Sequence, residues 1–71
     1  MRYLVVVEEG STSFGAYVPD LPGCIAAGES KVEALALIRE AIELHLADLR
    51  SDGLPIPRPS SVSEVVEVQA A

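Results

Sequence analysis

The residues best suited to nucleophilic chemistry are one cysteine and one histidine, Cys24 and His45, which could pair as nucleophile and base. Cys24 lies in an apolar predicted strand over residues 24–28, where a cysteine is more often a small core residue. His45 lies between two leucines of a predicted helix, where packing is the more common role. A catalytic pair is therefore the weaker interpretation. One cysteine also excludes an internal disulfide, and one cysteine with one histidine argues against a structural zinc site.

Acidic residues are the other groups that could support chemistry. Glu8 and Glu9 end a predicted strand and Asp20 lies in a later loop, so the three carboxylates could hold a Mg²⁺ ion. Adjacent strand residues point to opposite faces, so Glu8 and Glu9 cannot face one ion without a bulge. The sequence has neither a glycine-rich phosphate loop before a helix nor a nucleophile elbow. We predict no enzymatic activity, no metal site and no cofactor.

Size and charge favour a protein partner. A chain of 71 residues with 49% hydrophobic composition predicts one domain over residues 1–71 with a marginal core, which self-association as a homodimer or homotetramer would stabilise. The net charge of −6 argues against direct nucleic-acid binding and permits a basic protein partner. Neither a signal peptide nor an apolar run of about 18 residues is present, which predicts a cytoplasmic protein without a membrane span.

The elements that would position these residues follow the order β-β-β-α-β. Strands are predicted over residues 2–8, 14–18 and 24–28, with Pro19, Pro22 and Gly23 shaping a stiff loop between the last two. A capping box from Ser30 to Glu33 begins a helix over 31–50, and Gly53 ends it. After three spaced prolines, residues 62–68 read as a fourth strand.

The predicted arrangement is an α+β fold. The three strands form an antiparallel meander, and a right-handed crossover through the helix would lay the fourth strand parallel to the first. The first strand is apolar on both faces, with Leu4 and Val6 on one and Val5 and Val7 on the other. One helix covers only one face of a sheet, so the other face should meet a partner.

Several stretches of the sequence match a known family. They are Tyr17-Val-Pro-Asp-Leu-Pro-Gly-Cys24, Gly28, Ser30, Glu33-Ala34, Glu40-Ala-Ile-Glu-Leu44 and Asp52-Gly-Leu-Pro-Ile-Pro57. With these residues the chain resembles the HicB-like antitoxins, the small partners of HicA-type toxins. The match runs from the first strand to about Ser60 and so covers most of the chain.

The resemblance implies a partial RNase-H-like fold without hydrolytic activity. The sequence agrees, because the first strand has Leu4, Val5 and Val6 where a nuclease would need a metal-binding acid. Antitoxins of this family bind a small basic toxin that cleaves mRNA, and mask it. Many also carry a C-terminal DNA-binding domain. This chain ends at Ala71, just after the last predicted strand, so we expect no C-terminal DNA-binding domain and no operator binding by this chain alone.

The leading hypothesis is an antitoxin-like, protein-binding module that neutralises a HicA-like toxin by occlusion. Its exposed acidic residues Asp20, Glu29, Glu33 and Glu40 would face the basic surface of the toxin. The alternative is a stand-alone oligomeric adaptor of the same fold with no toxin partner. A nuclease remnant is the third and least supported interpretation.

Overall fold

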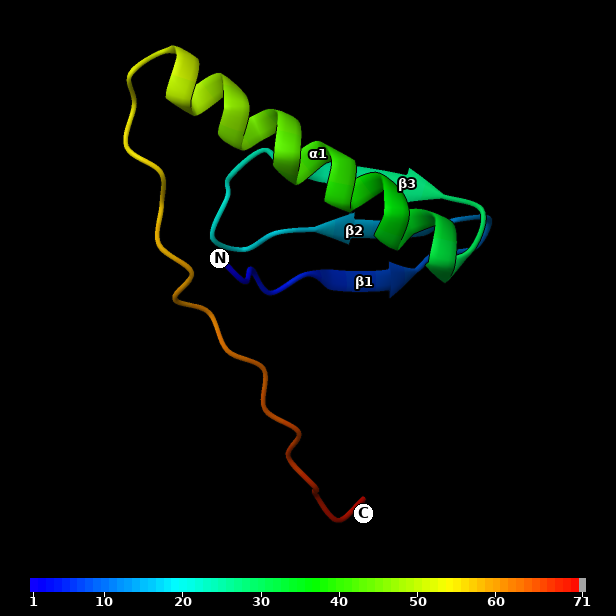
Figure 1. Cartoon of the computed structure of the whole chain (residues 1–71). Helices are drawn as coiled ribbons and strands as arrows, with labels where there is room; N and C mark the ends of the chain where they lie inside the picture. Colours follow the sequence, from blue (N-terminus) through cyan, green and yellow to red (C-terminus); the bar gives the residue numbers. More distant parts are fainter. Residues whose placement is uncertain (71) are drawn as a thin grey trace.

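Three short antiparallel strands and one long helix make up the domain in the computed structural model, which describes residues 1–70 (Figure 1). The strands are β1 (Val6–Glu9), β2 (Phe14–Tyr17) and β3 (Ile25–Gly28), and they lie in the order β1-β2-β3. The helix, α1, spans Lys31–Ser51. The antiparallel meander and the single helix of about five turns predicted from the sequence are thus confirmed.

β1 begins four residues later than predicted because its neighbour ends early. Val6, the first residue of β1, pairs with Tyr17, the last residue of β2. Beyond Tyr17 the chain turns instead of continuing: the Val18 N–H donates to the Cys24 carbonyl at 3.2 Å, and Pro19 has no N–H to offer a ladder. Residues 2–5 therefore have no strand to pair with along this edge.

The loop between β2 and β3 is built around a buried leucine. The Leu21 N–H donates to the Val18 carbonyl and the Leu21 carbonyl accepts from Cys24, which folds the loop back under the sheet. This places the Leu21 side chain at 0% exposure. Gly23 has φ +83°, a left-handed conformation that glycine adopts without strain, as the sequence predicts for this turn. The loop is therefore part of the core.

Both ends of α1 are capped as the sequence predicts. The Ser30 hydroxyl accepts from the Glu33 N–H at 3.1 Å. The Glu33 carboxylate reaches back to the N–H of Glu29 at 3.3 Å, one residue before the cap. At the other end Gly53 has φ +68°, and its N–H donates to the Arg50 carbonyl. Among residues 1–70 no helix has the length and apolar character needed to cross a membrane.

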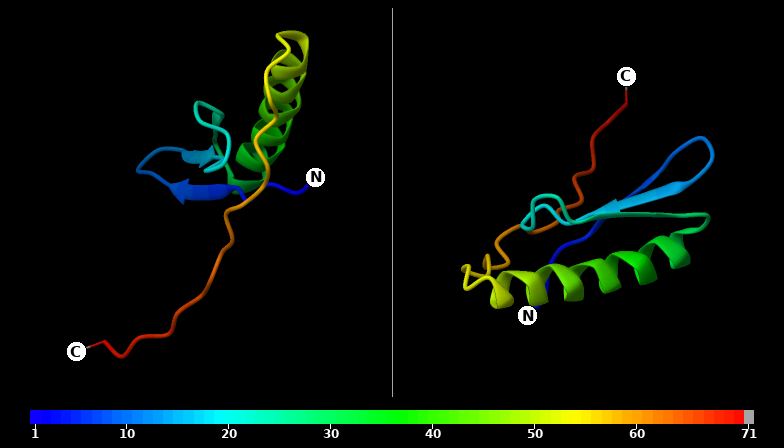
Figure 2. Two further views of the ribbon diagram at one scale, coloured as in Figure 1. Left: turned by 90° about the vertical axis from the view of Figure 1, so that its left-hand side faces the viewer. Right: turned by 90° about the horizontal axis from the view of Figure 1, so that it is seen from above.

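The core lies between α1 and one face of the sheet. Figure 2 shows the helix on one side of the three strands and no second layer of secondary structure on the other. From the helix, Ala34 and Ile38 are at most 1% exposed, and they pack against a buried set from the sheet side that comprises Ala16, Val18, Leu21 and Cys24. At Gly28 the helix backbone lies very close to β3, because a β-carbon there would be 2.8 Å from the Ala34 nitrogen.

The predicted fourth strand over residues 62–68 is absent from the sheet that residues 1–70 form, so this prediction is corrected. The chain after α1 passes along one end of the domain and then projects away from it (Figure 1). The Cα radius of gyration, 14.2 Å, exceeds the roughly 11 Å expected for a compact chain of this length. A strand forms only by pairing, and a local pattern of valines does not specify the pairing partner. We call residues 54–61 the connector and residues 62–68 the C-terminal arm.

Candidate protein-binding surface

The two residues considered for nucleophilic chemistry are not arranged for it. Cys24 is 3% exposed, and burial raises the pKa of its thiol, which keeps the sulfur protonated at neutral pH. His45 is half-buried on α1, and the hydrogen bonds found over residues 1–70 include none between it and Cys24. Packing is therefore the role that the structure supports for Cys24.

The three carboxylates considered for a metal lie at opposite ends of the sheet. Glu8 and Glu9 pair with Gly15 and Phe14 next to the β1–β2 hairpin. Asp20 lies beyond the other end of β2, in the loop that leads to β3. Within the part of the chain that the structure describes, no three His, Cys, Asp or Glu side chains come close enough to hold a metal ion.

Asp20 instead binds the connector. One carboxylate oxygen accepts from the backbone N–H groups of Ser60 and Ser61, both at 2.9 Å. The other oxygen accepts from the two serine hydroxyls, at 3.0 Å and 2.8 Å. The backbone donors, followed by the hydroxyls, lower the pKa of Asp20 to about 2, because they stabilise the ionised carboxylate. We call this set of four bonds the Asp20 clasp.

A second contact holds the connector to the start of the chain. The Tyr3 hydroxyl donates to the carbonyl oxygen of Pro57.

An open cleft of about 460 Å³ lies between residues 1–5 and α1, and its apolar wall includes Tyr3, Val5, Ile42 and Leu46. Arg39, which lies 3.8 Å from Glu43 in an exposed ion pair, also lines the cleft.

The uncovered face of the sheet carries an apolar row. Val6 pairs with Tyr17, and Tyr17 pairs with Ile25, so the three side chains lie side by side across all three strands. Tyr17 is 40% exposed and Ile25 is 71% exposed. The sequence predicts an apolar strand face that α1 leaves open, and the structure confirms it.

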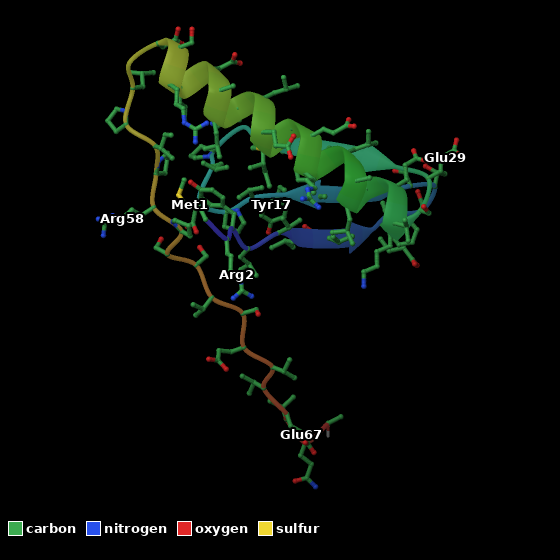
Figure 3. The ribbon with its side chains drawn as sticks, in the orientation of Figure 1. Met1, Arg2, Tyr17, Glu29, Arg58 and Glu67 are labelled. Atoms are coloured by element: carbon green, nitrogen blue, oxygen red, sulfur yellow. The ribbon has the colours of Figure 1, made fainter. Side chains whose placement is uncertain are left out.

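The four acidic residues predicted to contact a partner do not form one surface. Glu29 and Glu33 lie at the start of α1 and Glu40 lies near its middle, all exposed. Figure 3 shows Glu29 at the end of the domain away from Met1. Asp20 lies at the other end of the sheet, where its oxygens are engaged by Ser60 and Ser61.

Sequence reasoning missed the residues that hold the connector: Tyr3, Ser60 and Ser61. The bonded pairs are separated by 40, 41 and 54 positions in the chain, so no local pattern links them. One feature could have pointed to Asp20: a charged residue between two prolines in a short loop needs hydrogen-bond donors from elsewhere if the loop packs inward. Two adjacent serines after Pro59 are candidate donors.

Comparison with known proteins agrees with this architecture. The family model described as "HicB_like antitoxin of bacterial toxin-antitoxin system" matches residues 3–70. A "UPF0150 protein" of Helicobacter pylori is 42% identical over 67 residues, which cover 93% of each chain. "Antitoxin HicB 2" of Photorhabdus laumondii is 35% identical over all of this chain, which spans 52% of that protein.

A solved structure shares the fold. A chain of the "HicA3 and HicB3 toxin-antitoxin complex" superposes with a TM-score of 0.71 and 28% sequence identity, over 83% of this chain and 70% of that one. The family match spans nearly the whole sequence, including the Pro-Asp-Leu-Pro-Gly-Cys loop and the capped helix. The chain therefore belongs to the HicB-like antitoxin family of bacterial toxin–antitoxin systems.

Proposed function

We propose that this chain neutralises a small, basic, RNA-cleaving toxin of the HicA type by covering the surface with which the toxin binds RNA. The similarity to a chain of the HicA3 and HicB3 complex carries the proposal. The net charge of −6 supports it, because an RNA-binding toxin presents a basic surface that an acidic protein attracts. Occlusion of this kind requires no catalytic group and no cofactor on the antitoxin.

The acidic side of α1 is the surface that we assign to the toxin. Glu33 and Glu40 are seven residues apart and so share a face of the helix, and Glu29 lies just before its first turn. All three side chains are exposed. Asp20 is not part of this surface, because its carboxylate makes four hydrogen bonds to the connector at the other end of the sheet.

The test uses the product of the neighbouring gene, where that gene encodes a short basic protein, and a labelled single-stranded RNA. RNA cleavage by that protein should stop when an equimolar amount of this chain is added. Cleavage that continues in the presence of excess chain would refute neutralisation.

A pair of matched variants then locates the contact surface. Reversing Glu29 and Glu40 to lysine should slow association at low salt, and the difference should shrink as salt screens the charges. Reversing Glu8 and Glu9, two exposed acids at the end of β1, changes the net charge equally and should have a smaller effect. Equal slowing by both pairs would show that overall charge, and not the α1 surface, steers the encounter.

A stand-alone oligomeric adaptor without a toxin is the second candidate. The apolar row Val6–Tyr17–Ile25 favours it, because an exposed apolar face fits self-association as well as toxin binding. The absence of a small basic protein gene next to this one would favour the adaptor. Under either function, a gel-shift assay with operator DNA should show no binding by this acidic chain alone.

A further inference from the structure

The C-terminal arm has the pattern of a strand but lies on nothing in its own domain. Val62, Val66 and Val68 occupy alternate positions, with Glu64 as the one polar member of that side, and the three valines are 79%, 76% and 79% exposed. Val65, on the other side, is 99% exposed. Burying these valines would be favourable, so the C-terminal arm is a candidate segment for binding to another surface.

The matching surface is the outer edge of β1. Because β1 is at one end of the strand order, its backbone N–H and C=O groups on that side have no partner strand in the sheet. The helix packs across the face of the sheet and leaves this edge open (Figure 2). The side chains next to the edge, Val6 and Val7, are apolar and suit a valine-rich strand.

We propose that the arm of one copy adds as an antiparallel strand to the β1 edge of a second copy, and that the second copy returns its own arm in the same way. This gives a two-fold dimer with two exchanged arms. The proposal goes beyond toxin neutralisation and does not depend on it.

The hydrogen bonds at the start of the C-terminal arm explain why the arm projects away from its own domain. The Asp20 clasp fixes Ser60 and Ser61, and a shallow hollow of about 420 Å³ separates residues 61–63 from Arg2, Tyr3 and Leu4. From this anchored point the arm leaves the domain, as the position of Glu67 shows (Figure 3). Seven residues span about 23 Å when extended, which is enough to run along a strand of a neighbouring molecule.

Charge sets the direction of the added strand. β1 ends in Glu8 and Glu9, whereas Arg2 lies before its beginning. In an antiparallel pairing the tip of the arm, with Glu67, lies towards Arg2 and away from the two glutamates. A parallel pairing would bring Glu67 next to Glu8 and Glu9, and like charges on neighbouring strands are destabilising.

The first test measures the oligomeric state by sedimentation equilibrium of the full chain. The wild type should be a dimer, and Val66→Glu should raise the dissociation constant of the dimer by at least about tenfold. Val32→Glu is the matched control: Val32 is 79% exposed on the first turn of α1, outside the arm, and this variant adds the same charge. It should dimerise as the wild type does. A monomeric wild type, a dimer that survives Val66→Glu, or equal weakening by both variants would overturn the proposal.

The second test distinguishes exchange between molecules from docking of the arm on its own β1. In a Cys24→Ala background, Leu4→Cys with Val66→Cys places two thiols together only in the antiparallel exchanged dimer. Glu8→Cys with Val66→Cys places them together if the arm pairs in parallel with its own domain. Oxidation should convert the first double variant into a covalent dimer on a non-reducing gel and leave the second without a cross-link. An internal disulfide in the second, or no covalent dimer in the first, would overturn the proposal.

Discussion

Replacing Gly28 with alanine tests how closely the helix approaches the sheet. The new β-carbon would lie 2.8 Å from the Ala34 nitrogen and 3.1 Å from the carbonyl carbon of Glu33. An ordinary van der Waals contact begins at 3.4 Å, so the helix and β3 must separate by about 0.6 Å, the difference between 3.4 and 2.8 Å. Ala34 is fully buried, so a separation at this point disturbs the core.

The magnitude follows from two opposing effects. Overpacking of a core costs about 1–3 kcal/mol, and a clash with helix backbone, which cannot rotate away, belongs at the upper end of that range. Alanine restricts the unfolded chain more than glycine does, and this effect raises the free energy of unfolding by about 0.4–1 kcal/mol. The net loss in the free energy of unfolding should be about 2 kcal/mol, or about 8–16 °C in melting temperature for a domain of this size.

The assay is thermal and urea unfolding followed by circular dichroism at 222 nm. All variants are compared at one protein concentration, because self-association makes the melting temperature depend on concentration. Gly15→Ala is the matched control, since a β-carbon there meets no atom within 4 Å and the φ of Gly15 is not positive. It should leave stability unchanged or raise it slightly. If Gly28→Ala were as stable as Gly15→Ala, the inferred close approach of α1 to β3 would be wrong.

Three further changes probe the loop, the core and the clasp. Gly23→Val should lower the free energy of unfolding by about 1–3 kcal/mol, purely through backbone strain, since φ is +83° and a β-carbon has open space; an unchanged denaturation midpoint would exclude that strain. Leu21→Ala should lower the free energy of unfolding by about 2–5 kcal/mol. Leu44→Ala is the control, because Leu44 is 67% exposed, and it should lower the free energy of unfolding by less than about 0.5 kcal/mol. Similar urea midpoints for the two variants would show that Leu21 is not a core residue. The pKa of Asp20 is depressed from 3.8 to about 2, so the clasp should contribute fully above pH 3.8 and be lost as the pH falls through about 2. Amide chemical shifts of Ser60 and Ser61 should report this titration, and Asp20→Asn should abolish it.

Local patterns predicted the elements whose stability is local. The capping box at Ser30 and the glycine at position 53 defined α1 to within one residue, because each acts through bonds to neighbouring backbone groups. Gly23 was predicted for the same kind of reason, since the need for a left-handed residue after Pro22 is a property of the turn itself. The apolar face left open by a single helix followed from the alternation in the first strand.

What depends on distant residues was not predictable in this way. Asp20 is predicted to face a partner because an acidic loop residue suits a basic toxin surface, but its oxygens are held by serines some 40 positions away. The prediction of a fourth strand over residues 62–68 was wrong for a related reason. The valine pattern specifies a face to bury, but it does not specify the sheet edge with which the segment pairs. The start of β1 was set by where β2 turns, which only the paired structure reveals.

The way in which the connector is held has a consequence for the dynamics of the domain. Apart from the Leu54 N–H, which donates to the Leu49 carbonyl at 2.9 Å, residues 54–61 are held by side-chain contacts near the surface, namely the Asp20 clasp and the bond from Tyr3 to Pro57. Three of these eight residues are prolines. Such a segment can open while the sheet and helix stay folded, as a separate unit of low local stability. Amide hydrogens of Ser60 and Ser61 would then exchange with solvent far sooner than those of α1. The direction in which the following valines are presented would be set by this local opening, at no cost to the core.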